Sequence, residues 1–275
     1  MKTLDLSWNS FDNLQFYGRC WQPEKAPKAV IGLIHGLGEH IQRYEHVAAA
    51  LTEKGYAIVG MDLRGHGRTG GPRGHAPSFE SFMKDIDRLF VEIDRLFPGS
   101  PRFIYGHSLG GILTLNYVLR RRPLFSGAIV TSPGLHTALE EQKVKVMLAK
   151  VLGSIAPSAG MPSGLDTAGL SQDARVVEAY RNDPLVHDRV SFGMGKGLLE
   201  AIRYAFQNAR GFVLPLLLMH GTQDPIAFPT SSMEYAPLVM GDRALKLWEG
   251  CLHELHNEPQ KAEVFQYLID WLEKH

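Results

Sequence analysis

The segment Gly106-His107-Ser108-Leu109-Gly110-Gly111 decides the fold. It follows an apolar run that is typical of a buried strand, and a helical pattern begins directly after it. A serine on such a strand-to-helix turn is pushed outward, and the turn can close only if the flanking positions lack side chains. Gly106 and Gly110 meet that need. The amino terminus of the following helix also favours a developing negative charge. We therefore predict that Ser108 is a nucleophile.

A nucleophilic serine needs a general base and an acid that orients the base. Asp224 comes just after the apolar segment Leu214–His220, and His253 follows the segment Ala244–Trp248. Alone, each has a simpler interpretation, as a turn-forming aspartate before proline and as a surface-loop histidine. Their order after Ser108 and their placement at strand ends make the joint interpretation as acid and base the stronger one. His256 has a similar spacing, but it lies near the start of the last helix, where a positive charge is disfavoured. We predict His253 as the base.

Acyl transfer also needs backbone N–H groups that bind the oxyanion. We expect one from Leu109, the residue after the nucleophile. The second is expected from Leu37, in the glycine-containing loop His35-Gly36-Leu37-Gly38-Glu39-His40. We interpret His35 and His40 as buried groups that brace this loop.

Short apolar runs alternate with helical patterns along the chain, which predicts a mostly parallel sheet flanked by helices. The predicted strands cover Thr3–Trp8, Leu14–Trp21, Ala29–His35, Ala57–Met61, Arg102–Gly106, Gly127–Ser132, Leu214–His220 and Ala244–Trp248. The predicted helices cover Tyr44–Lys54, Ser78–Phe97, Gly110–Arg121 and Pro259–Glu273. The first two strands are expected to pair antiparallel.

One stretch interrupts this alternation. Residues 136–208 contain helical patterns and no convincing strand, so we expect a helical cap or lid there, inserted between core segments 1–135 and 209–275. Its clearest apolar stripe consists of Val144, Met147, Leu148, Val151, Leu152 and Ile155. We expect this stripe to line a substrate channel, although a stripe of this kind also suits ordinary core packing.

Composition excludes several classes of protein. Lys plus Arg and Asp plus Glu both number 29 in the 275 residues, so the formal net charge is zero and a nucleic-acid partner is not expected. The histidines show no paired zinc-ligand motif, so we expect no metal, and the proposed chemistry needs no cofactor. Two cysteines form no disulfide framework and the amino terminus has no apolar leader, which favours a cytoplasmic location.

Five segments carry a family resemblance. They are residues 35–40, 62–68, 106–111, 180–185 and 249–256, which read HGLGEH, DLRGHGR, GHSLGG, YRNDPL and EGCLHELH. Together they resemble the monoacylglycerol lipase and lysophospholipase group of the α/β-hydrolases, over nearly the whole chain. The resemblance implies the α/β-hydrolase fold, with an eight-stranded sheet and a lid over an apolar acyl channel. It also implies that Glu39, Arg43, Tyr180 and His256 contact the polar alcohol end of the substrate. Thr69-Gly70-Gly71 departs from the group, which more often has Ser followed by a charged residue.

The sequence thus predicts a serine carboxylic-ester hydrolase. Its expected partner is a small ester with a single acyl chain, such as a monoacylglycerol, and the lid is expected to contact lipid surfaces transiently. A lysophospholipase, a general carboxylesterase and a cofactor-free perhydrolase would use the same triad. A catalytically silent binding protein has no need for Ser108, Asp224 and His253 together.

Overall fold

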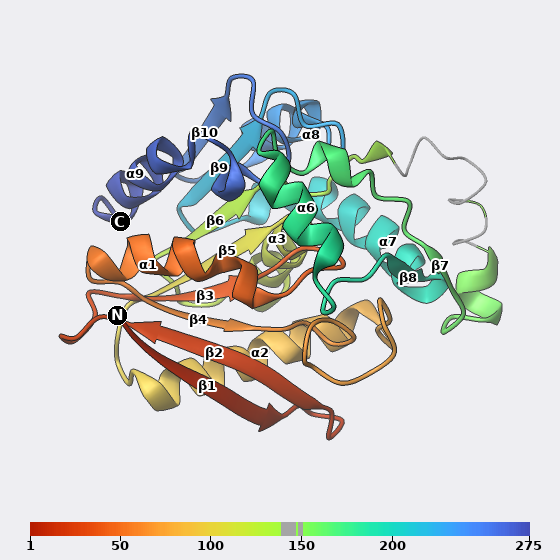
Figure 1. Ribbon diagram of the computed structural model, residues 1–275, viewed down its shortest axis with the longest axis horizontal. Helices are drawn as coiled ribbons and strands as arrows, with labels where there is room; N and C mark the ends of the chain where they lie inside the picture. The colour runs from red at the N-terminus through yellow and green to blue at the C-terminus, as the bar shows by residue number, and fades with distance from the viewer. Residues whose placement is uncertain (139–146, 148–150) are drawn as a thin grey trace.

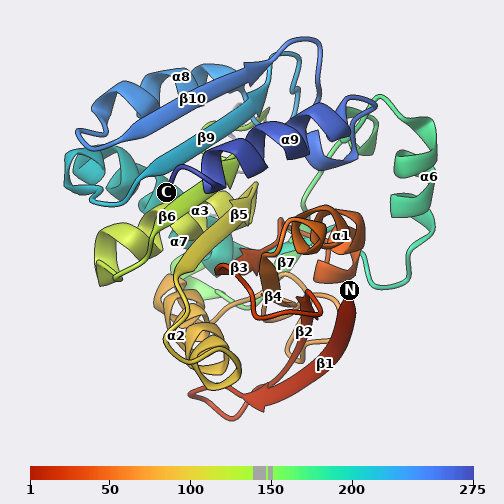
Figure 2. The ribbon, with the colours of Figure 1, turned by 90° about the vertical axis from the view of Figure 1, so that its left-hand side faces the viewer.

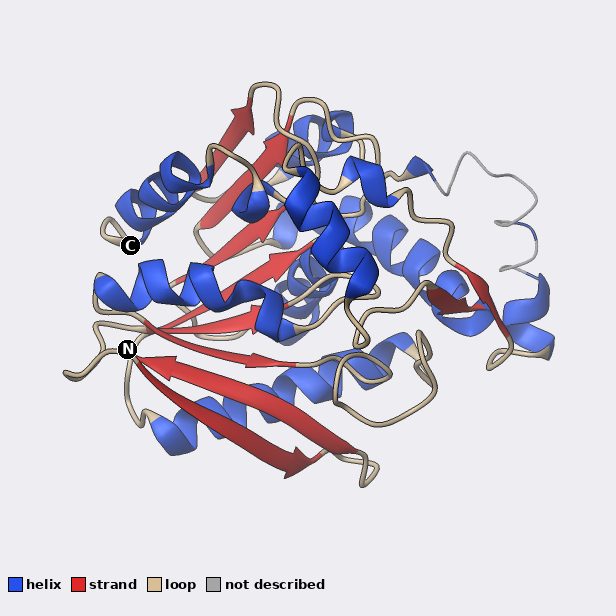
Figure 3. Cartoon of the chain, in the orientation of Figure 1, coloured by secondary structure: helices blue, strands red, loops and turns tan. Residues whose placement is uncertain are grey.

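The computed structural model describes residues 1–138, 147 and 151–275. Its main sheet has eight strands in the order β1-β2-β4-β3-β5-β6-β9-β10 (Figure 1). Figure 3 shows these strands in red. Their bounds are β1 Lys2–Asn9, β2 Gln15–Gln22, β3 Val30–Ile34, β4 Ala57–Met61, β5 Arg102–His107, β6 Gly127–Thr131, β9 Leu216–Gly221 and β10 Arg243–Trp248. Strand β2 runs antiparallel to both of its neighbours, and the pairs from β4 through β10 are parallel.

Helices cover both faces of the sheet because the central strands are buried on both sides. In β3, Ile31 and Leu33 join one hydrophobic cluster, while Val30 and Ile34 join the other. The first cluster is completed by α1 (Glu45–Glu53) and α9 (Lys261–Leu272). The second is completed by α2 (Phe79–Leu96), α3 (Leu109–Arg121) and α8 (Pro229–Tyr235). Figure 2 shows α1 and α9 side by side, with α2 across the sheet from them.

The predicted mostly parallel α/β architecture is confirmed, and each predicted strand or helix ends within two residues of the observed one. The short helix α8 was not predicted, because its seven residues are too few to show a helical period.

The segment between β6 and β9 contains the elements inserted into the alternating pattern. Its described part includes η2 (Thr167–Gly169), α6 (Ala174–Asn182) and α7 (Phe192–Asn208). Asp173 and Ser191 cap α6 and α7 by accepting hydrogen bonds from backbone amides. The expectation that the segment has no strand was wrong, since β7 (Gly160–Pro162) pairs antiparallel with β8 (Arg189–Ser191). Strands of three residues are too short for an alternation of apolar and polar residues to be recognised in the sequence.

The inserted segment lies at the edge of the sheet toward which the parallel strands point, and both chain ends lie on the opposite side (Figure 1). The carboxyl ends of parallel strands are where ligands bind in open α/β sheets. Within the described ranges, no helix has both the length and the apolar character needed to cross a membrane.

Candidate active site

Ser108 sits on a strained turn between β5 and α3. Its backbone has φ 54° and ψ −114°, a conformation that residues other than glycine rarely adopt. A Cβ on Gly106 would lie 2.1 Å from the carbonyl oxygen of Gly110, and one on Gly110 would lie 2.1 Å from that of Ile34. Both glycines are therefore required for β3, β5 and α3 to approach this closely. Strain of this kind is maintained at functional sites by the surrounding packing.

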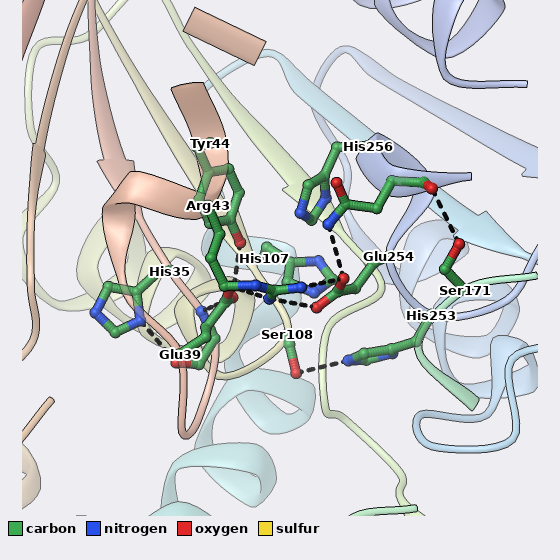
Figure 4. Close-up of polar contacts among 12 residues, drawn as sticks. His35, Glu39, Arg43, Tyr44, His107, Ser108, Ser171, His253, Glu254 and His256 are labelled. Carbon is green, nitrogen blue, oxygen red and sulfur yellow. Dashed lines mark hydrogen bonds and ion pairs between the residues drawn. The ribbon is translucent and has the colours of Figure 1, made fainter. Parts of the chain in front are cut away.

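The side chains of Ser108, His253 and Asp224 form a continuous chain of hydrogen bonds. The Oγ of Ser108 lies 3.0 Å from Nε2 of His253. Figure 4 marks this hydrogen bond with a dashed line. Nδ1 of His253 lies 2.7 Å from Oδ2 of Asp224. These three residues follow the carboxyl ends of β5, β9 and β10, and the sheet order here is β5-β6-β9-β10. In this geometry the imidazole can accept a proton from the serine while the carboxylate holds its other nitrogen.

Asp224 is buried but well supplied with donors. The backbone amides of Ile226 and Ala227 donate to Oδ1 at 2.8 and 3.0 Å, and His220 and His253 both face Oδ2. Burial alone would raise the pKa of Asp224, but the charge of His253 and hydrogen bonds from both histidines lower it below its ordinary value. Asp224 is therefore a carboxylate that stays ionised in a buried site.

The same pairing acts on His253 in the opposite direction. Burial alone would lower the pKa of His253, but the Asp224 carboxylate outweighs it and raises the pKa above its ordinary value of 6.5. The backbone of the His253 loop is anchored to the inserted segment, because the amide of Glu254 donates to the carbonyl of Leu170 at 2.8 Å. The imidazole can therefore carry a positive charge without leaving its position.

The two amides expected to bind an oxyanion both belong to residues beside Ser108. Leu37 and Leu109 line the same cavity as Ser108. Leu109 is the first residue of α3, so its N–H has no partner within the helix. The Leu37 turn is braced by Glu39, which accepts a hydrogen bond from the Gly36 amide at 2.6 Å.

A cavity of about 410 Å³ opens above Ser108. Most of its wall is apolar, and α7 contributes three large side chains, those of Leu198, Leu199 and Ile202. Further apolar lining comes from Ile112, Met161, Leu165, Leu170, Val190 and Ile226. A cavity of this size and character suits an alkyl chain whose ester end reaches Ser108.

The predicted stripe takes no part in this wall as far as it is described. Met147, Val151 and Ile155 are 58%, 53% and 75% exposed, and none of them lines the cavity. The expectation that they line a channel was therefore wrong, because α7 occupies that position instead. Val144 and Leu148 lie outside the described residues.

The predicted polar end is a buried ion cluster. Arg43 donates both of its terminal nitrogens to Glu254 at 2.6 Å and one of them to Glu39 at 2.6 Å (Figure 4). Its guanidinium lies over the ring of Tyr180, 4.7 Å from the centroid. Glu39, Glu254 and Tyr180 line the cavity, whereas Arg43 lies behind them.

His256 also lies away from the cavity. It is 1% exposed, and its ring is stacked on Tyr44 with centroids 4.5 Å apart. Sequence reasoning placed Arg43 and His256 at the alcohol end, but in the structure they line no part of the cavity and support its wall from behind.

His35 and His40 have the bracing role expected of them. Nδ1 of His35 donates to the Gly36 carbonyl, and its Nε2 accepts from the Leu63 amide at 2.8 Å. His40 pairs with Asp183 at 2.9 Å, which links the loop to the inserted segment. His220 is a site residue that the sequence analysis missed, and its position directly before Gly221 at the end of β9 was the available signal.

Comparisons with known proteins agree with this geometry. Residues 25–260 match the family described as serine aminopeptidase, S33. The chain is 34% identical over 258 residues to a monoacylglycerol lipase of Mycolicibacterium smegmatis, covering 93% of this chain and 91% of the relative. It is 39% identical over 259 residues, 93% of this chain, to an uncharacterised abhydrolase domain-containing protein of Dictyostelium discoideum, of which it spans 27%.

A solved structure is also similar. The crystal structure of a monoacylglycerol lipase of Paleococcus ferrophilus matches 99% of this chain and 98% of its own, with a TM-score of 0.85 and 32% identity. The family match covers most of the chain, and the Mycolicibacterium relative is similar over 91% of its own length. The chain belongs to the serine aminopeptidase S33 family of α/β-hydrolases and, within that superfamily, to the monoacylglycerol lipase group.

Proposed function

We propose that this chain is a serine carboxylic-ester hydrolase that cleaves monoacylglycerol-like, single-chain esters through an acyl-enzyme. The observation that carries the proposal is the hydrogen-bond chain from Ser108 Oγ through His253 to Asp224, at the floor of an apolar cavity. The monoacylglycerol lipases among its relatives support the same substrate class.

The first half-reaction forms the acyl-enzyme. Ser108 Oγ attacks the ester carbonyl carbon as its proton passes to Nε2 of His253, and the amides of Leu37 and Leu109 bind the oxyanion. When the tetrahedral intermediate collapses, the carbon–oxygen bond to the alcohol breaks and the alcohol oxygen takes the proton from His253. Asp224 stabilises the transient imidazolium through Nδ1.

The second half-reaction releases the acid. A water molecule gives a proton to His253 and attacks the acyl carbon, and the bond to Ser108 Oγ then breaks as Oγ regains a proton. In each half-reaction Nε2 of His253 takes up one proton and then releases it. The reaction therefore needs no cofactor.

The polar lining favours a neutral alcohol over a phosphate-bearing one. Among the described residues, the cavity is lined by the carboxylates Glu39, Asp166 and Glu254 and by no lysine or arginine. A phosphoglycerol group would face these carboxylates with no lysine or arginine on the described cavity wall to pair with it, because Arg43 lies behind Glu39 and Glu254 and is already bound to both. An unpaired charge is costly in a partly buried site. Glycerol hydroxyls, in contrast, can donate to carboxylate oxygens. We therefore rank monoacylglycerols above lysophospholipids.

We propose further that residues 136–208 form a cap on a core made of residues 1–135 and 209–275. The support is the position of α7 over Ser108 and the contacts of η2 with the His253 loop. Met147, Val151 and Ile155 present apolar side chains to solvent, which suits transient contact with a lipid surface.

Initial rates across matched substrates test the proposal. One acyl chain is presented as a monoacylglycerol, a lysophospholipid and a nitrophenyl ester, and Ser108→Ala is run as the blank. The proposal predicts the highest kcat/KM among natural esters for the monoacylglycerol and none above background in Ser108→Ala. Equal or faster turnover of the lysophospholipid contradicts the alcohol preference, and activity in Ser108→Ala contradicts the mechanism.

A further inference from the structure

His220 is a second histidine on the carboxylate of Asp224. It is the next-to-last residue of β9 and its side chain is fully buried. Its Nε2 lies 3.1 Å from Oδ2 of Asp224, the same oxygen that faces His253, and 2.8 Å from the carbonyl oxygen of Ala227. Its Nδ1 lies 2.7 Å from Oγ of Ser232, which is on α8. His220 takes no part in the two acyl-transfer half-reactions given above.

The partners of His220 determine which of its nitrogens carries the proton. A backbone carbonyl and an ionised carboxylate can only accept hydrogen bonds, so Nε2 must be a donor shared between them. The Ser232 hydroxyl can donate, so a neutral ring accepts at Nδ1 from that hydroxyl. Each polar atom of the His220 ring is thereby satisfied, although the side chain is buried.

We propose that His220 is a positioning residue that, through its Nε2–H, holds the Asp224 carboxylate and withdraws part of its charge from His253. The inference rests on the proposed function, because it concerns the acid of the same triad. Asp224 Oδ1 is occupied by two backbone amides, so its orientation is set on that side by the chain itself. On the Oδ2 side, His220 is a donor that does not contact Ser108, whereas His253 bonds both Asp224 and Ser108.

The consequence is a measurable effect on the base. A donor on Oδ2 delocalises carboxylate charge, and its loss leaves more charge facing Nδ1 of His253, which favours the imidazolium. The other titratable groups that act on His253 include Glu254, Glu39, His256 and His107, whose ring centroid lies 4.9 Å away. A change at residue 220 leaves these four groups in place, so a shift in the titration of His253 reports on Asp224.

Three variants separate the donor from the bulk of the side chain. His220→Leu removes the donor and keeps an apolar side chain in the site. His220→Gln supplies a donor again, because the NH₂ group of the glutamine amide can donate to Asp224 and to the Ala227 carbonyl. The amide oxygen can accept from the Ser232 hydroxyl. Ser232→Ala leaves His220 in place but removes the hydroxyl that favours its Nε2–H form. Ser231→Ala is the matched control, since Ser231 is on the same helix, equally buried, and donates to the Phe228 carbonyl instead.

The experiment is the pH dependence of two rates: kcat/KM on a nitrophenyl ester, and inactivation by a fluorophosphonate, which needs no turnover. In His220→Leu the acid limb of both profiles is expected to move up by about one pH unit, a tenfold change in proton affinity. His220→Gln and Ser231→Ala are expected to keep the parental limb, and Ser232→Ala to shift it upward by less. If His220→Leu fails to fold, Ser232→Ala against Ser231→Ala decides the question alone.

The proposal is overturned if an active His220→Leu keeps the parental acid limb of the pH profile. It is also overturned if His220→Gln shifts this limb as far as His220→Leu does. Where His220→Leu does not fold, an unshifted acid limb in Ser232→Ala overturns it. These outcomes are distinct from failure of the proposed function, in which the parental enzyme itself shows no Ser108-dependent hydrolysis or labelling.

Discussion

The imidazole of His256 lies stacked on the phenol of Tyr44, with ring centroids 4.5 Å apart and planes inclined by 20°. Neither ring nitrogen of His256 has a hydrogen-bond partner in the part of the chain that the structure describes. Burial lowers the pKa of His256 well below its ordinary value, and the neighbouring His107 adds to the effect. A base must become positively charged during the reaction, so this histidine is unsuited to that role, whereas His253 faces a carboxylate.

The two histidines are therefore predicted to fail in different ways when replaced. His253→Ala should lower kcat by on the order of 10³ or more, as expected for loss of a triad member. His256→Ala should keep most of its kcat and instead lose about 2 kcal/mol of unfolding free energy, because it removes buried packing beneath Tyr44. Steady-state kinetics and urea denaturation of both variants check this.

A severe loss of kcat in a stably folded His256→Ala, together with an active His253→Ala, would mean that the roles are exchanged. Burial without a hydrogen-bond partner in the described part of the chain disfavours the charged form of His256. The dipole of the last helix is not needed to explain this.

The turn around Ser108 is predicted to tolerate no side chain at Gly110. Gly110→Ala puts a methyl group 2.1 Å from a backbone oxygen of β3, where only a shift of main chain relieves the contact. We expect a loss of about 3 kcal/mol or failure to fold. Gly211→Ala is the control, because a Cβ there meets nothing within 4 Å. Equal thermal midpoints for the two variants would show that the turn is not tightly packed.

The wall formed by α7 is predicted to set the preference for acyl chains. Leu199→Ser and Ile202→Ser, which alter cavity-lining residues, should weaken kcat/KM for long-chain esters by about 1–3 kcal/mol and leave acetate esters nearly unchanged. Leu124→Ser, at a solvent-exposed position outside the inserted segment and the cavity wall, is the comparison and should leave both substrates unchanged. An equal loss on long and short esters would argue that α7 only supports the fold.

The pH profile should reflect the pairing of His253 with Asp224. The Asp224 carboxylate raises the pKa of His253, and hydrolysis needs the neutral imidazole. Activity is therefore present above this raised pKa and is lost as the pH falls through it, so the acid limb of kcat/KM should have its midpoint above 6.5. Asp224→Asn should lower kcat by about 10⁴-fold, because the amide would favour the wrong tautomer of the His253 imidazole. A parental midpoint clearly below 6.5 would contradict the pairing.

Much of the fold was predictable because β-strand and helix periods are local properties. Ser108, Asp224 and His253 could be proposed together because each follows a strand of one parallel sheet, and the ends of such strands meet at one edge. The hydrogen bonds joining them are found in the structure, while their catalytic roles remain predictions.

Other features depend on contacts between distant segments and leave no local pattern. Arg43 is turned away from the cavity because Glu254, 211 positions later, binds its guanidinium at both terminal nitrogens. The function of His220 depends on Ser232, which is on a helix too short to predict. Met147, Val151 and Ile155 have helical spacing, but periodicity does not say whether an apolar stripe meets the core, a substrate or solvent.

The most direct test of the account is stoichiometric labelling by a fluorophosphonate, with the modified residue located by peptide mass spectrometry. The account predicts one phosphonyl group per chain on Ser108, none in Ser108→Ala, and much slower labelling in His253→Ala, in which the base is missing. Labelling of another serine, or labelling of Ser108→Ala at the parental rate, would contradict it.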